Sequence, residues 1–219
     1  MNIFDIIGPV MIGPSSSHTA GAARLGKVAM HILGEKLLFA EITLYGSFAK
    51  THKGHGTDLA LVAGLLGLQP DDERLRESFK LAKERGVGFK FLQGELKREM
   101  HPNSVMFKLK GSSSERVVVG ASIGGGRVIV SSIDGFSVNI SGEYPTVITL
   151  HEDKPGMVGR ISTLLATYDI NIAQMRVSRS QKGGTALMVV ETDSEIPKYV
   201  EDAIKEIEGI KRAISIAPL

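Results

Sequence analysis

The stretch TVITLHEDKPGMVGRISTLLATYDINIA, residues 146–173, decides the fold of the C-terminal third of this 219-residue chain. An apolar strand pattern runs into an Asp-Lys-Pro-Gly turn, a helical pattern follows, and a second strand starts directly after it. We predict strands over Thr146–His151, Ile170–Ser180, Thr185–Glu191 and Ile210–Ile216, and helices over Pro155–Tyr168 and Pro197–Glu208. This βαββαβ order predicts a ferredoxin-like domain over residues 146–219.

Residues 1–142 are predicted to form a separate domain, which the turn-rich segment Ser141–Pro145 links to the C-terminal one. From Gly88 to Ser137 the pattern is that of an antiparallel β section with glycine turns. The chain is therefore predicted to be of the α+β class. Ahead of the β section we predict an extended segment over Ile3–Ile12, helices over Thr19–Leu33, Leu59–Leu66 and Asp72–Arg85, a strand over Leu37–Tyr45 and a polar loop over 46–58.

The stretch IGPSSSHTAGAARL, residues 12–25, places Ser15, Ser16, Ser17, His18 and Thr19 directly before an alanine-rich helical segment. Free backbone N–H groups and the positive end of a helix dipole meet hydroxyls there, which favours a carboxylate or phosphate ligand. One serine is explained as a helix N-cap. The remaining hydroxyls and the histidine exceed what a cap needs, so we predict a binding site.

The run GSFAKTHKGHGTD, residues 46–58, repeats this theme ahead of the next helix. Thr57 or Asp58 can cap that helix. Two histidines and a lysine between glycines are not explained by capping. The spacing of His52 and His55 also permits a metal site, but H-x-x-H alone is a weak signal and no carboxylate partner is evident.

Two other polar segments allow more than one interpretation. His101-Pro102-Asn103 stands at the start of a strand, where it either lines a pocket or forms a plain turn. Gly124-Gly125-Gly126 invites comparison with a phosphate-binding loop. Because a strand and not a helix follows these glycines, we predict a hairpin turn there.

Composition excludes several classes of function. The chain has no cysteine, so disulfides, thiolate catalysis and thiolate-bound metals are excluded within it. A net charge of +2 with scattered Lys and Arg does not favour nucleic acid. No apolar run spans a bilayer, and the N-terminus has no signal-peptide pattern. We therefore expect a cytoplasmic protein that binds neither nucleic acid nor membranes.

The C-terminal segment resembles an ACT domain, the small-molecule regulatory module of amino-acid enzymes. The resemblance rests on HEDKPGMVG, residues 151–159, and on the later Asn-Ile of INIA, residues 170–173. It implies homodimerisation and an amino acid bound at the dimer interface. The implied ligand-binding residues are His151, Asp153, Gly156 and Asn171.

Nearly the whole chain resembles the β chain of the two-subunit iron–sulfur L-serine dehydratases. The motifs that carry this resemblance are FDIIGP (4–9), GPSSSHT (13–19), GHGTD (54–58) and HPN (101–103). In the family, this N-terminal part is an allosteric-substrate-binding fold. The resemblance implies deamination of L-serine to pyruvate and ammonia, with a [4Fe–4S] cluster on a partner α chain that acts as a Lewis acid. Because this chain has no cysteine, we expect it to hold no metal and to be inactive alone.

The resemblance also implies roles for individual residues. His18 and His55 are the candidates for proton transfer. The implied substrate-binding residues are Ser15, Ser16, Ser17, Thr19, Thr57, Asp58, His101 and Asn103. The alternative is a non-catalytic, serine-binding module that regulates another enzyme.

Overall fold

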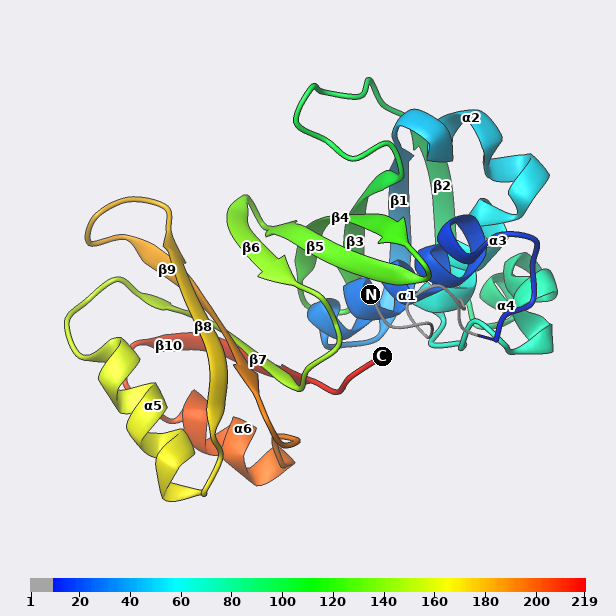
Figure 1. Cartoon of the computed structure of the whole chain (residues 1–219). Coiled ribbons are helices and arrows are strands. Elements are labelled where there is room, and N and C mark those ends of the chain that lie inside the picture. The colour runs from blue at the N-terminus through cyan, green and yellow to red at the C-terminus, as the bar shows by residue number, and fades with distance from the viewer. Residues whose placement is uncertain (1–9) are drawn as a thin grey trace. The chain divides into compact units, whose positions relative to one another are not determined.

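The computed structural model describes residues 10–219, and the chain divides into two compact units, Met1–Gly135 and Phe136–Leu219 (Figure 1). Most of the extended segment predicted over Ile3–Ile12, and the motif at residues 4–9, lie outside the described residues. None of the helices in residues 10–219 has the length and hydropathy that a bilayer crossing needs.

The N-terminal unit combines a twisted sheet with helices. The sheet order is β2-β1-β3-β4-β5-β6, in which β1 pairs in parallel with β2 and antiparallel with β3. The helices are η2 (Ser16–Ala20), α1 (Gly21–Leu33), α2 (Gly46–His55), α3 (Thr57–Leu65), η3 (Glu73–Glu77) and α4 (Ser78–Glu84). The strands of this unit are β1 (Leu37–Leu44), β2 (Gly88–Gln93), β3 (Ser104–Gly111), β4 (Glu115–Gly124) and β5 (Arg127–Ile133). The sixth strand in the sheet order, β6 (Phe136–Ile140), follows the last residue of the unit, Gly135.

The antiparallel section predicted from Gly88 to Ser137 is confirmed for β3, β4 and β5, and β1 also pairs antiparallel with β3. The first strand of that section, β2, pairs in parallel with β1 instead. A parallel pair needs a long crossover, and the helices α2, α3 and α4 supply it. The glycines 124–126 form the turn of the β4–β5 hairpin, each with a positive φ, so the predicted hairpin is confirmed.

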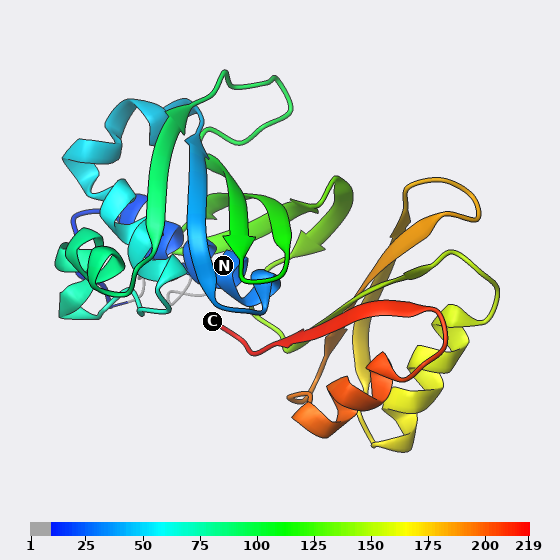
Figure 2. The same ribbon diagram turned by 180° about the vertical axis from the view of Figure 1, so that it is seen from behind.

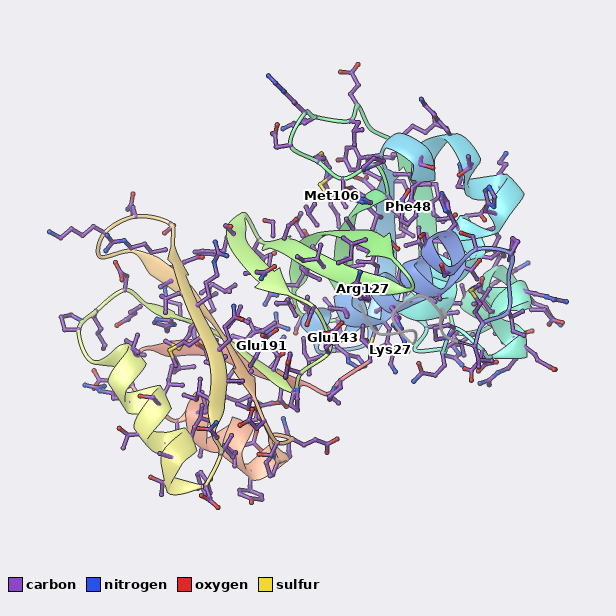
Figure 3. All side chains as sticks on the ribbon, viewed as in Figure 1. Lys27, Phe48, Met106, Arg127, Glu143 and Glu191 are labelled. Carbon is purple, nitrogen blue, oxygen red and sulfur yellow. The ribbon has the colours of Figure 1, made fainter. Side chains whose placement is uncertain are left out.

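Two of the predicted elements are corrected. The segment predicted as a polar loop is largely the helix α2, because Phe48 is fully buried beneath it (labelled in Figure 3) and Gly56, with φ 66°, ends it. The burial of Phe48 here stabilises a helix that the local sequence favours only weakly. The helix predicted over Asp72–Arg85 is a 3₁₀ turn followed by the short helix α4, with Asp72 capping the turn.

The C-terminal unit is a four-stranded antiparallel sheet in the order β10-β7-β9-β8, with both helices on one face (Figures 1 and 2). Its elements are β7 (Thr146–Glu152), α5 (Met157–Thr167), β8 (Ile172–Arg179), β9 (Thr185–Thr192), α6 (Lys198–Lys205) and β10 (Ile210–Ile216). Ile161, Val200 and Ile204 of the helices pack with Val147 and Met188 of the sheet. The predicted ferredoxin-like order is confirmed.

Candidate functional site

The serine-rich motif forms a tight turn that leads into α1. Ser15 is the N-cap, and its Oγ accepts a hydrogen bond from the backbone N–H of His18 at 3.2 Å. Residues Ser16–Ala20 then form a single π-helical turn, a feature that is frequent at functional sites. Ser15 is thus the capping serine, whereas Ser16 and Ser17 remain half-buried in the turn.

His18 is held from several sides. Its Nδ1 lies 3.4 Å from Ser15 Oγ and its Nε2 lies 3.1 Å from Ser47 Oγ on α2. The ring meets Phe48 edge-on at 5.3 Å and lies 5.0 Å from the ring of His55. Burial, together with the neighbouring His55, lowers the pKa of His18. His18 is therefore neutral at pH 7 and can accept a proton.

The second polar motif borders the same turn. Thr19 is buried, and its Oγ1 donates to the carbonyl oxygen of His55 at 3.5 Å. Gly56, and neither Thr57 nor Asp58, is the N-cap of α3. The predicted capping role of Thr57 or Asp58 is therefore wrong. Gly56, in a left-handed conformation, is both the C-cap of α2 and the N-cap of α3. Asp58 accepts instead from the backbone N–H of Leu59.

The third motif, residues 101–103, acts through its backbone. The Pro102 carbonyl accepts from the N–H of Ser47 at 2.8 Å, and the Asn103 carbonyl accepts from the N–H of Ser122 at 3.1 Å. The side chain of His101 is exposed, and its Nδ1 accepts from the Asn103 N–H. This segment therefore ties the start of α2 to the end of β4, next to the serine-rich turn.

Several buried polar atoms around the turn have no hydrogen-bond partner among the described residues. They are His55 Nδ1, Thr57 Oγ1 and Ser122 Oγ. Ser122 lies against Gly21 at the start of α1, where a Cβ would come within 2.1 Å of its Oγ. Unpaired buried polar atoms are rare and point to a missing ligand or water.

Sequence reasoning did not select Ser47 or Ser122 as site residues. Ser47 stands inside the second polar motif, so its position in that run was an available signal. Ser122 lies within a strand pattern and carries no local signal. Only the pairing of β3 with β4 and the packing of α1 bring it to the site.

The same unit shows that three consecutive serines can hold a carboxylate. Glu35 accepts from the hydroxyls of Ser112, Ser113 and Ser114 and from the backbone N–H of Ser113. These hydrogen bonds, led by that of Ser112, lower the pKa of Glu35 to about 2. A run of serines with free N–H groups is therefore suited to a carboxylate ligand.

The alternative metal site gains no support. His52 Nδ1 lies 3.0 Å from the carbonyl oxygen of Ala49, within its own helix. Among residues 10–219, no group of three His, Asp or Glu side chains is arranged to hold a metal ion. The chain has no cysteine, so its residues do not fit an iron–sulfur cluster either.

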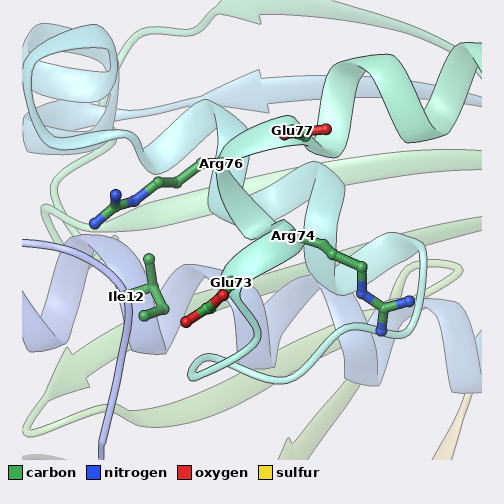
Figure 4. A pocket seen from close by; sticks show the side chains of 5 residues that line it. All are labelled: Ile12, Glu73, Arg74, Arg76 and Glu77. Carbon is green, nitrogen blue, oxygen red and sulfur yellow. The ribbon is translucent and has the colours of Figure 1, made fainter.

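Two surface cavities are lined by none of the predicted site residues. One, of about 450 Å³, is lined by Ile12, Glu73, Arg74, Arg76 and Glu77 (Figure 4). Arg74 there is already paired with Asp72. The other, of about 580 Å³, lies between α5 and the segment after α6.

The predicted ACT ligand residues occupy two ends of the C-terminal sheet. His151 and Asp153 lie at the end of β7, and Gly156 is the N-cap of α5. Asn171 precedes β8, and the first residue of that strand, Ile172, pairs with Thr192 at the end of β9. The neighbouring Glu191 pairs with Thr146, which is the first residue of β7. One copy of the chain therefore does not bring Asn171 together with the other three.

The polar groups at these ends have partners within the unit. His151 is buried, with Nδ1 3.4 Å from Thr149 Oγ1, and burial lowers its pKa against the opposing influence of Asp153 and Thr149. Asp153 accepts from the Gly183 N–H at 2.9 Å. Asn171 donates to Asp193 at 2.6 Å.

The fold and these sites define an α+β subunit that carries an ACT domain at its C-terminus. A family model described as "ACT domain" matches residues 146–209, and one described as "Serine dehydratase beta chain" matches residues 2–88. The chain belongs to the serine dehydratase β-chain family.

Individual relatives agree with this assignment. The chain is 39% identical over 216 residues to the probable L-serine dehydratase, beta chain, of Bacillus subtilis, with 99% of this chain and 98% of that protein covered. It is 38% identical over 211 residues to the L-serine dehydratase, beta chain, of Peptoniphilus asaccharolyticus, with 96% and 95% covered. It is 31% identical over 194 residues to the D-3-phosphoglycerate dehydrogenase of Methanocaldococcus jannaschii, with 87% of this chain and 36% of that protein covered.

Proposed function

We propose that this chain is the β subunit of an L-serine dehydratase, which works with an α chain to convert L-serine to pyruvate and ammonia in the cytoplasm. The observation that carries the proposal is the identity of 38–39% to two named β chains over nearly their full length. The arrangement of hydroxyls, N–H groups and imidazoles around the η2 turn is compatible with an amino-acid substrate.

In this proposal the serine-rich turn binds the substrate carboxylate. The hydroxyls of Ser15, Ser16 and Ser17 and the N–H groups at the start of the helix are the donors, as in the serine cradle around Glu35. Thr19 supports the turn by donating to the His55 carbonyl oxygen.

The remaining predicted residues orient substrate and move protons. A neutral imidazole at His18 suits removal or return of a proton near pH 7, and His55 lies beside it at 5.0 Å between ring centroids. Thr57 has a buried, unpaired hydroxyl, and Asp58 offers a carboxylate for the substrate ammonium. His101 and Asn103 act at the edge of the site, where the carbonyls of Pro102 and Asn103 join α2 and β4.

The [4Fe–4S] cluster is assigned to the α chain. This chain lacks the thiolates that hold such clusters, so none of its residues is proposed as a ligand. When bound to the partner, the cluster supplies Lewis-acid chemistry. We therefore expect the isolated chain to be inactive.

We propose that the ACT domain adds amino-acid regulation or dimerisation. Within one copy, Asn171 lies at the opposite end of the sheet from His151, Asp153 and Gly156. A single ligand that contacts all four groups therefore requires a second copy of the domain, which favours a site shared by two chains.

An anaerobic assay of pyruvate formation tests the main proposal. L-serine is supplied to this chain alone, to the candidate α chain alone, and to their mixture after cluster reconstitution. Activity in the mixture only is the expected result. The absence of activity in the mixture, while the α chain holds an intact cluster by its absorption spectrum, would contradict the proposal.

A serine-binding regulatory module is the second candidate. Its support is that the same pair of units matches about a third of a dehydrogenase, an enzyme with different chemistry. Saturable binding of L-serine to this chain by calorimetry, combined with no pyruvate in any mixture, would favour this candidate.

A further inference from the structure

The His18 imidazole is bounded by a hydroxyl at each ring nitrogen. Ser15 Oγ lies 3.4 Å from Nδ1, and Ser47 Oγ lies 3.1 Å from Nε2. Ser15 belongs to the same turn as His18, whereas Ser47 comes from α2, 29 residues further along the chain. The shorter contact is therefore the one that tertiary structure creates.

The position of Ser47 is fixed by its backbone. Gly46 has φ 54°, and a Cβ there would lie 2.5 Å from the Pro102 carbonyl oxygen. That same oxygen accepts from the Ser47 N–H at 2.8 Å. The start of α2 is thus held against residues 101–103 at a place where only glycine fits, and the Ser47 hydroxyl is aimed at His18 as a result.

Two hydroxyls are a matched environment for a neutral imidazole. Such a ring has one N–H donor and one acceptor nitrogen, while a hydroxyl can do either. With a hydroxyl at both nitrogens, either tautomer can form both hydrogen bonds, so the two contacts fix the orientation of the ring. Among the described residues, the titratable side chain in contact with the His18 ring is His55, whose charge would disfavour an imidazolium.

We infer that Ser47 is a positioning residue of this site, which holds the His18 ring in one orientation for proton transfer. The inference rests on the proposed function, because it assigns His18 a reaction to serve. Ser47 itself needs no contact with substrate.

Three variants test this inference. Ser47→Ala removes the hydroxyl at Nε2, and Ser47→Thr retains it. Thr51→Ala is the matched control, because Thr51 lies one turn further along α2 and donates to the Ser47 carbonyl oxygen without contacting His18. Thermal melts of all three identify any loss of folding.

The first readout is independent of activity. Nitrogen-15 spectra of the chain, labelled at histidine, report which ring nitrogen of His18 carries the proton and how this changes with pH. We expect Ser47→Ala to shift the Nε2 resonance, because it removes the hydrogen-bond partner of that nitrogen. Ser47→Thr and Thr51→Ala should keep the wild-type pattern. An unchanged pattern in Ser47→Ala would overturn the inference.

The second readout is the kinetics of the reconstituted enzyme. Ser47→Ala should lower kcat by about 10- to 100-fold with KM changed less than about threefold, and should alter the pH profile of kcat. An equal loss in Thr51→Ala, or an unchanged kcat in folded Ser47→Ala, would overturn the positioning role. If the wild-type mixture forms no pyruvate, the proposed function fails, and the spectra alone still decide whether Ser47 holds the His18 ring.

Discussion

Gly64 of α3 lies so close to Ala23 of α1 that a Cβ at position 64 would come within 1.9 Å of the Ala23 carbonyl oxygen. Gly26 of α1 makes the reciprocal approach, since a Cβ there would lie 2.4 Å from the Leu61 carbonyl oxygen. The two helices that begin at the two polar motifs therefore pack backbone against backbone. This contact sets the distance between the motifs.

The first prediction concerns this helix contact. Gly64→Ala forces the helices apart, because a backbone atom cannot move aside as a flexible side chain can, and we expect a loss of about 1–3 kcal/mol in the free energy of unfolding. For a chain of this size, each kcal/mol lowers the melting temperature by about 2–4 °C. Thermal melts measure this effect.

Gly54→Ala is the control for that experiment. Gly54 lies in α2, and no atom lies within 4 Å of the position that a Cβ would take there, so alanine should be neutral or stabilise by about 0.5–1 kcal/mol. Equal melting temperatures for Gly64→Ala and the wild type would show that α1 and α3 are not in backbone contact.

The second prediction separates strain from contact at two glycines with similar φ values, 54° at Gly46 and 66° at Gly56. Alanine in a left-handed conformation lowers the free energy of unfolding of both variants by about 1–2 kcal/mol. Only Gly46→Ala also collides with Pro102, since position 56 has open space. We expect Gly46→Ala to melt lower than Gly56→Ala and to lose more activity in the reconstituted enzyme, because it displaces Ser47. Identical effects in the two variants would exclude the collision.

The third prediction tests the serine-rich turn. Ser16→Ala and Thr19→Ala should raise KM for L-serine or abolish turnover in the reconstituted enzyme, because they remove a donor to the substrate carboxylate or the bond that holds the turn. A lost hydrogen bond to a charged group costs about 1.5–3 kcal/mol, which corresponds to a change of about 10- to 100-fold in kcat/KM. Ser162→Ala is the control, because this half-buried hydroxyl on α5 donates to the Gly159 carbonyl oxygen within its own helix. Wild-type kinetics in both test variants would remove the turn from the substrate site.

The fourth prediction concerns acid stability of the C-terminal unit. Burial raises the pKa of Glu201, but hydrogen bonds from Lys198, Lys205 and Ser215 outweigh it and lower the pKa to about 2. Because the folded-state pKa lies below the ordinary 4.5, ionised Glu201 stabilises the fold above about pH 4.5, and this contribution is lost as the pH falls toward 2.

Glu201→Gln should therefore destabilise the chain by about 2–3 kcal/mol at pH 7 and by much less near pH 2. Chemical unfolding at both pH values measures the difference. Glu195→Gln, at an exposed position, is the control. The pKa values of Glu35 and Asp72 are also lowered to about 2, so these residues add to the acid sensitivity of the chain. Their contribution is the same in Glu201→Gln and in Glu195→Gln, and it therefore cancels when the two variants are compared. A variant equally destabilised at both pH values would contradict this account.

A second buried carboxylate of the C-terminal unit has the opposite shift. Burial raises the pKa of Glu191, and Glu143 nearby adds to it against a hydrogen bond from Ser141 (Glu143 and Glu191 are labelled in Figure 3). Its ionisation opposes folding as the pH rises, so the two carboxylates give this unit contrary pH dependences.

Local information in the sequence was enough for the C-terminal fold. Apolar periodicity, the Pro-Gly turn at residues 155–156 and the spacing of strands are properties of neighbouring residues, and they determine βαββαβ without reference to the rest of the chain. The first two polar motifs were equally visible, because runs of hydroxyl and histidine residues before a helix exceed what capping requires. The absence of cysteine settled by itself that this chain cannot supply thiolate ligands.

Only the tertiary structure decided how these motifs meet. The burial of Phe48 stabilises a helix in a glycine-rich segment. Ser47 contacts His18 from another helix, and Ser122 lies beside the start of α1 although its strand carries no motif. Such contacts join residues from 29 to more than 100 positions apart, where local propensity carries no information. Asn171 shows the opposite effect. The sequence motifs predicted Asn171 and Asp153 as binding residues for one ligand, but the strand register places them at opposite ends of the sheet. Register and helix packing depend on burial shared by the whole unit, and that is why the folded chain was needed to place them.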